Sequence, residues 1–122
     1  MEFVRKNWIW AAIVLVSVGF SAAGIAKLMG VPMAHVSFAK LGLPAWFGYF
    51  IGVCEIAGAI GIYLRKLSAL AAAGLVIIMI GAVGYHVAFD PLTNAVPALV
   101  LLLLSGAIVA KRRANGLWAR AT

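Results

Sequence analysis

Three ionisable side chains lie within long apolar stretches of this sequence: Lys27, Glu55 and His86. Charged groups are costly inside a membrane, so such residues usually face a partner or a functional site. A carboxylate can exchange protons and accept hydrogen bonds, and a nearby cation stabilises its charge. The three residue types therefore indicate an intramembrane polar cluster or a ligand-binding site. The competing interpretations are a structural ion pair for Glu55, extension to the headgroups for Lys27 and an interfacial hydrogen bond for His86.

No combination of residues predicts catalysis by this chain alone. The sequence has no nucleophile–base pair, no metal-ligand cluster and no phosphate-binding glycine loop. Its single cysteine, Cys54, excludes an intramolecular disulfide and a CxxC redox pair. The two histidines are His86 and His35, and His35 falls in a predicted loop, so we expect neither haem nor a metal ion. We therefore do not expect this chain to be an enzyme on its own.

Aromatic residues gather at the start of the second apolar stretch. Trp46, Tyr49 and Phe50 could form the wall of a site for quinone or a similar molecule. Aromatic side chains are also common where membrane helices meet the headgroups. We favour this interfacial belt and keep the ligand wall as the alternative.

The overall composition points to a membrane protein. The chain has 122 residues, 66% of them hydrophobic and only 11% charged. Soluble domains carry about 25% charged residues, because their surface faces water. The net charge of +7 does not indicate nucleic-acid binding, because the basic residues sit at the ends of apolar stretches.

Four apolar stretches predict four helices that cross the membrane, in a single transmembrane domain over residues 1–122. Each is close to the ~20 residues that a bilayer core requires, and backbone groups in lipid must be hydrogen-bonded within the segment. We therefore predict an all-α, four-transmembrane-helix bundle. Residues 33–41 are too short to span and predict an interfacial segment, with His35 and Lys40 towards water. The predicted spans are 8–29, 44–64, 67–89 and 95–110.

The basic residues also predict the orientation. Short loops rich in Lys and Arg stay on the cytoplasmic side. The basic residues of both termini and of the second loop are Arg5, Lys6, Arg65, Lys66, Lys111, Arg112, Arg113 and Arg120. The first loop contains only Lys40 and the third contains none, so we predict that both termini are cytoplasmic.

Helix geometry predicts that Lys27 and Glu55 approach each other. At ~1.5 Å per residue, Lys27 lies near the outer boundary and Glu55 near the middle of the membrane. Helical side chains lean towards the amino terminus of their own helix. The first two helices run in opposite directions, so the two side chains lean towards one level in the outer half. His86 reaches a similar level.

Small residues predict the helix contacts. Gly48 and Gly52 have the spacing that allows membrane helices to approach closely, and Gly74 and Gly81 lie seven residues apart.

Three segments resemble the DoxX-like family of small four-helix membrane proteins: SAAGIAKL at 21–28, FAKLGLPAW at 38–46 and GVCEIAGA at 52–59. Gly81 and His86 in the third apolar stretch are similar too, so the resemblance covers essentially the whole chain. It implies a four-helix bundle with Lys27 and Glu55 as its signature polar pair. The family takes its name from a subunit of a thiosulfate:quinone oxidoreductase, and other members accompany redox enzymes or assist membrane-protein assembly.

The resemblance implies an accessory or scaffold subunit of a membrane redox system that binds quinone or another lipid-like ligand. The expected partners are the lipid bilayer, a membrane redox protein and further copies of the chain, with no nucleic acid. The expected location is the bacterial inner membrane. Two alternatives remain: a small proton-coupled transporter that uses Glu55, and an assembly chaperone. Small multidrug transporters carry their essential glutamate in the first helix, where this chain has Lys27.

Overall fold

The computed structural model describes residues 2–113, apart from the side chains of residues 3 and 5. Within this part of the chain all regular structure is helical, and three helices are long and apolar enough to cross a membrane. A fourth, α3, is apolar but shorter. The prediction of an all-α, four-helix membrane bundle is confirmed. The elements are α1 (Glu2–Leu28), α2 (Pro32–Lys40), α3 (Trp46–Gly61), α4 (Ser68–Phe89), η1 (Leu92–Asn94) and α5 (Ala95–Arg112).

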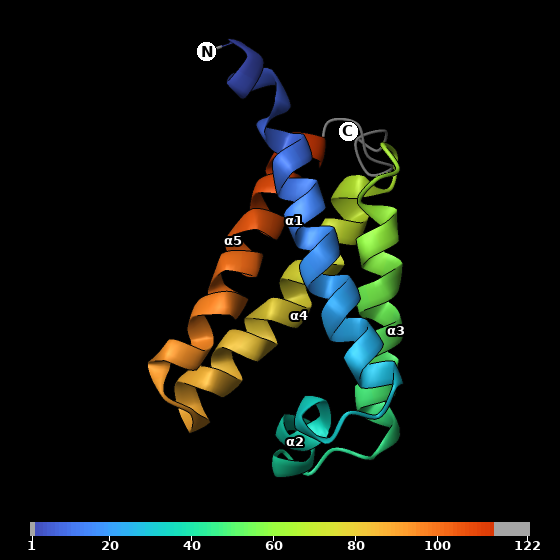
Figure 1. Ribbon diagram of the computed structural model, residues 1–122, viewed down its shortest axis with the longest axis vertical. Helices are drawn as coiled ribbons and strands as arrows, with labels where there is room; N and C mark the ends of the chain where they lie inside the picture. The colour runs from blue at the N-terminus through green and yellow to red at the C-terminus, as the bar shows by residue number, and fades with distance from the viewer. Residues whose placement is uncertain (1, 114–122) are drawn as a thin grey trace.

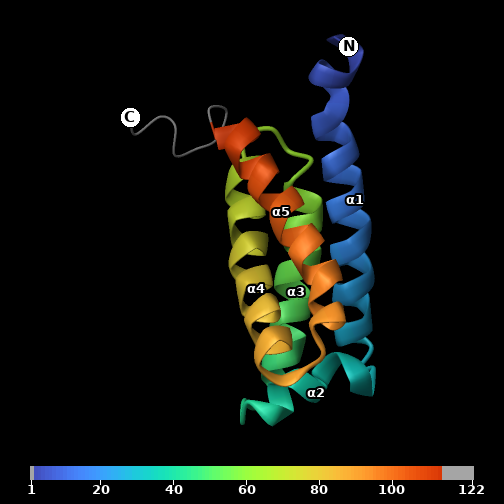
Figure 2. The same ribbon diagram turned by 90° about the vertical axis from the view of Figure 1, so that its left-hand side faces the viewer.

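The four long helices form a closed ring in which each packs on two others. α1 packs on α3 and α5, and α4 packs on the same two helices from the other side. α1 and α4 run away from the end of the bundle where α1 begins, whereas α3 and α5 run towards it (Figures 1 and 2). The buried core includes Phe20 from α1, Leu75 from α4 and Ile108 from α5.

Helix α3 is shorter than the predicted span at 44–64. Its 16 residues rise about 24 Å, against a hydrocarbon thickness of about 30 Å. The helix ends at Gly61 because the chain then turns, with the Leu64 amide bonded to the Gly61 carbonyl. The polar residues of this turn, Arg65 and Lys66, lie outside the helix.

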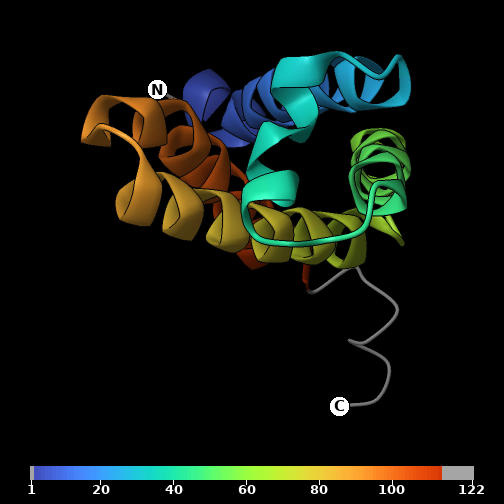
Figure 3. The same cartoon turned by 90° about the horizontal axis from the view of Figure 1, so that it is seen from below.

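The segment between α1 and α3 forms the helix α2, which lies across the end of the bundle (Figure 3). Gly30 and Gly42 flank it with φ angles of 74° and 75°. Side chains with a Cβ rarely adopt this backbone conformation, so both glycines are needed where the chain turns into and out of α2.

The predicted glycine contacts are found in α3 but not in α4. Gly48 and Gly52 are buried, the first beneath α2 and the second against α1. A Cβ placed at Gly74 or Gly81 would meet no neighbouring atom within 4 Å. These two glycines therefore mark no helix contact within the described chain, and a contact between chains stays a prediction.

The predicted orientation can be tested with cysteines at opposite ends of the bundle. In a Cys54→Ser background, Leu92→Cys should react with a membrane-impermeant maleimide added to intact cells, and Lys66→Cys should not. Both residues are exposed, so both should react once the membrane is permeabilised. The reverse pattern in intact cells would contradict cytoplasmic termini.

Candidate intramembrane binding site

A cavity of about 720 Å³ lies at the end of the bundle that α2 covers. Helices α1, α2, α3 and α4 all contribute to its wall, which is mostly apolar. The apolar lining includes Phe38, Phe47, Ile51, Ile77, Ile78 and Gly81, and the polar lining includes Lys27, Glu55, Tyr85, His86, Asp90 and Asn94. The three ionisable residues that the sequence singles out therefore line one cavity.

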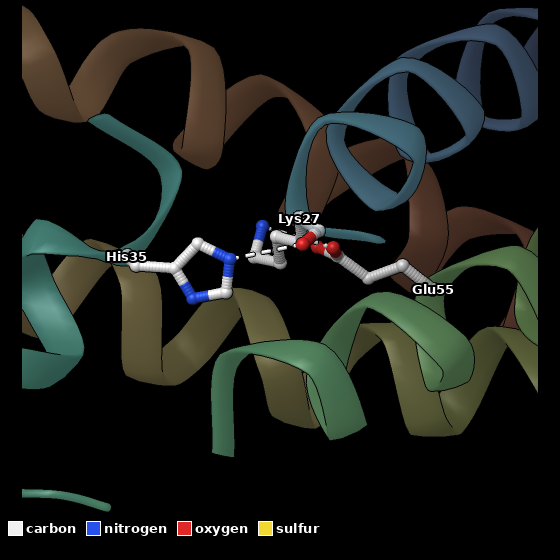
Figure 4. Close-up of polar contacts among 3 residues, drawn as sticks. All are labelled: Lys27, His35 and Glu55. Atoms are coloured by element: carbon white, nitrogen blue, oxygen red, sulfur yellow. Dashed lines mark hydrogen bonds and ion pairs between the residues drawn. The ribbon is translucent and has the colours of Figure 1, made fainter. Parts of the chain in front are cut away.

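Lys27 and Glu55 are in contact within this cavity. The Lys27 Nζ lies 2.9 Å from Glu55 Oε1, with the side chains 14% and 1% exposed (Figure 4). Gly52 makes the approach possible, because a Cβ there would lie 2.9 Å from the Lys27 Cβ. The lysine stem thus passes over Gly52, and its ammonium group reaches the carboxylate one helical turn further along α3.

The carboxylate keeps unused hydrogen-bonding capacity. Glu55 Oε1 is buried and lies 2.9 Å from the Lys27 ammonium nitrogen, as an ion pair. A carboxylate oxygen can accept more than one hydrogen bond. The Glu55 carboxylate borders the cavity beside Lys27, and Lys27 is the more exposed member of the pair.

His86 lies on the same cavity but pairs with another residue. Its Nδ1 is 2.8 Å from Asp90 Oδ2, one turn later at the end of α4. Its ring also contacts Tyr85 edge-on, with 5.7 Å between the ring centroids. Asp90 is a nearer partner than either member of the Lys27–Glu55 pair, so the three predicted residues share a cavity without forming one contact cluster.

His35 does not line the cavity, but it contacts the backbone of Lys27, and the sequence pattern did not predict this contact. Its Nε2 lies 2.9 Å from the Lys27 carbonyl oxygen, so this nitrogen acts as the donor (Figure 4). Its ring stacks on Tyr49 at 4.6 Å and packs directly over Gly48. The prediction that His35 faces water was wrong, because the missing side chain at Gly48 leaves room for the ring between α2 and α3. Gly48 was the one signal in the sequence for this contact.

The aromatic residues proposed as a ligand wall lie elsewhere. Trp46, Tyr49 and Phe50 are all exposed on α3, and their neighbour Phe47 lines the cavity instead. Trp46 and Phe50 form an edge-on pair with centroids 6.2 Å apart.

A sequence model of the DoxX-like family matches residues 11–108. The chain belongs to the DoxX-like family. The match confirms the family resemblance and includes every residue that lines the cavity of this DoxX-like protein. Neither the curated proteins nor the solved structures contain a match to the chain.

The cavity of this DoxX-like protein suits a molecule that is mostly apolar and carries a small polar group. Apolar side chains form most of the wall, while Lys27 and Glu55 offer a donor and an acceptor side by side. Among residues 2–113 no group of three or more His, Cys, Asp or Glu side chains is placed to hold a metal ion.

Proposed function

We propose that this DoxX-like membrane protein is an accessory or scaffold subunit of a membrane redox system, and that its cavity holds a quinone or another lipid-like molecule. The observation that carries the proposal is the cavity with the Lys27–Glu55 pair in its wall. Its volume of about 720 Å³ is in the range of small-molecule sites. The bacterial inner membrane, where quinones serve respiratory enzymes, is the location that we propose.

The polar pair matches the head group of a quinone or quinol. The Lys27 ammonium group can donate a hydrogen bond to a quinone carbonyl oxygen, and the Glu55 carboxylate, which borders the cavity, is the acceptor for a quinol hydroxyl. Buried donors and acceptors of this kind fix the orientation of an otherwise apolar ligand. The hydrocarbon chain would lie against Ile51, Ile77 and Ile78.

The contact with Lys27 weighs against the alternative of a proton-coupled transporter. Such a transporter would need Glu55 to bind a cationic substrate and protons in turn. A cation of the chain itself already lies 2.9 Å from the carboxylate. The third interpretation, an assembly chaperone, draws no support from a particular residue contact.

Binding of a short-chain quinone tests the proposed ligand. Gly81 lines the cavity and has open space at its Cβ position, so Gly81→Phe should fill part of the cavity without a clash. We expect saturable binding of decylubiquinone to the purified protein by calorimetric titration, with affinity about tenfold weaker in Gly81→Phe, or about 1.4 kcal/mol.

Gly74→Phe is the matched control. Gly74 lies two turns earlier on α4, has equally open surroundings and does not line the cavity. It should bind quinone like the wild type. Equal weakening in both variants, or no saturable binding by the wild type, would contradict a quinone site in the cavity.

The accessory role is tested separately from the ligand. Crosslinking in native membranes, followed by purification of the tagged chain, should recover a membrane redox protein. Recovery of this chain alone, or with copies of itself only, would contradict that role.

A further inference from the structure

A buried arginine lies at the opposite end of the bundle from the cavity. Arg112, the last residue of α5, is only 5% exposed. Its guanidinium carbon lies 5.2 Å from the centroid of the Trp10 ring, in the geometry of a cation–π contact. This contact places the guanidinium group at the level of Trp10, which lies close to the amino-terminal end of the α1 span.

The charge of Arg112 has no acidic partner in the described chain. Within residues 2–113 its Nε is buried and has no hydrogen-bond partner, and Arg65, in the turn before α4, adds a second positive charge at this end of the bundle. The three acidic residues of the chain lie elsewhere. Glu55 pairs with Lys27, Asp90 pairs with His86, and Glu2 is exposed in the first turn of α1.

The start of α4 adds further donors at this end of the bundle. Ser68, its first residue, is fully buried, and its hydroxyl oxygen has no hydrogen-bond partner. Leu67 precedes it without a side-chain cap, so the first amides of α4 have no capping acceptor. The amino end of a helix carries a partial positive charge and attracts anions.

We infer that Arg112, Arg65 and the start of α4 form a binding site for the phosphate group of an anionic phospholipid. Burying an arginine without a counter-ion is costly, and a phosphate can provide both the negative charge and the acceptor atoms for the guanidinium group of Arg112. Lipid rather than free phosphate is the source that the position favours, because Arg112 ends the α5 span and rests on Trp10. This site is independent of the proposed quinone cavity.

Native mass spectrometry of the full chain released from nanodiscs tests this site. The nanodiscs contain phosphatidylglycerol and phosphatidylcholine in equal amounts. The wild type should retain phosphatidylglycerol in preference to phosphatidylcholine, and Arg112→Gln should reduce that preference about tenfold. Lys111→Gln is the matched control, because it removes the same charge from an exposed neighbour, and it should keep the preference.

The remaining outcomes are also decisive. If Arg112→Gln does not fold, Arg65→Gln at an exposed loop position takes its place, and an unchanged lipid preference in that variant would overturn the site. Equal preference in Arg112→Gln and Lys111→Gln would also overturn it. If inorganic phosphate raises the thermal stability of the protein and phosphatidylglycerol is not enriched, the ligand of this site is a free anion and the lipid assignment is overturned. Recovery of an acidic protein in place of lipid would reject the phosphate assignment.

Discussion

Lys27→Met and Glu55→Gln should each markedly destabilise the protein in detergent. Each substitution leaves the other side chain of the buried pair without its partner at 2.9 Å. The loss of one member of a buried pair costs about 3–5 kcal/mol of unfolding free energy. Uptake of a proton by Glu55, or extension of Lys27 to the headgroups, would reduce this loss. Circular dichroism, recorded while each variant is unfolded in denaturant, measures the loss of unfolding free energy.

The double variant separates a coupled pair from two independent residues. Lys27→Met with Glu55→Gln should lose less stability than the sum of the two single changes, because no charge remains unpaired. Lys66→Met with Glu55→Gln is the control, and it should be additive, because Lys66 is exposed in the turn between α3 and α4 and does not line the cavity. Strict additivity for Lys27 and Glu55 would show that the two residues do not interact, and Lys27 would then act as a headgroup anchor.

Gly24→Ala should push α1 away from α3. We expect it to lower the unfolding free energy by about 1–3 kcal/mol, which is typical of an overpacked contact. A Cβ at Gly24 would lie 2.9 Å from the backbone oxygen of Gly52 and 2.8 Å from two atoms of Ile56. The isoleucine can rotate, but the backbone carbonyl cannot, so the two helices must move apart. The same movement would draw Lys27 away from Glu55.

Gly74→Ala is the control for this prediction. It introduces the same methyl group in α4, where no atom lies within 4 Å. Alanine is the better helix former, so this variant should match the wild type or exceed it slightly. If Gly74→Ala lowers the unfolding free energy as much as Gly24→Ala does, the effect does not come from the contact between α1 and α3.

The membrane bundle was predictable from the sequence because length and hydropathy constrain a membrane helix strongly. The ends of α3 were less predictable. Apolar residues continue from Gly61 to Leu64, so composition alone cannot reveal that the chain already turns there. The turn depends on how α3 and α4 join, which is a property of the packed hairpin.

The site was predictable in part, for a similar reason. The approach of Lys27 to Glu55 was predictable because side chains on antiparallel helices lean towards each other. This prediction needs only the direction of each helix and the height of each residue in the membrane. The position of His35 depends on two glycine turns, at Gly30 and Gly42, and on the space above Gly48. No local pattern determines where a short interfacial helix docks, so this contact requires the three-dimensional structure.

Native mass spectrometry from a mild detergent is the most direct test of the central claim, which is that the cavity holds a quinone or another lipid-like molecule. We predict that the wild type and Gly74→Phe carry a bound molecule whose fragments identify a quinone or a lipid, and that Gly81→Phe has lost it. A bare wild-type chain, or the same bound molecule in Gly81→Phe as in Gly74→Phe, would contradict the claim.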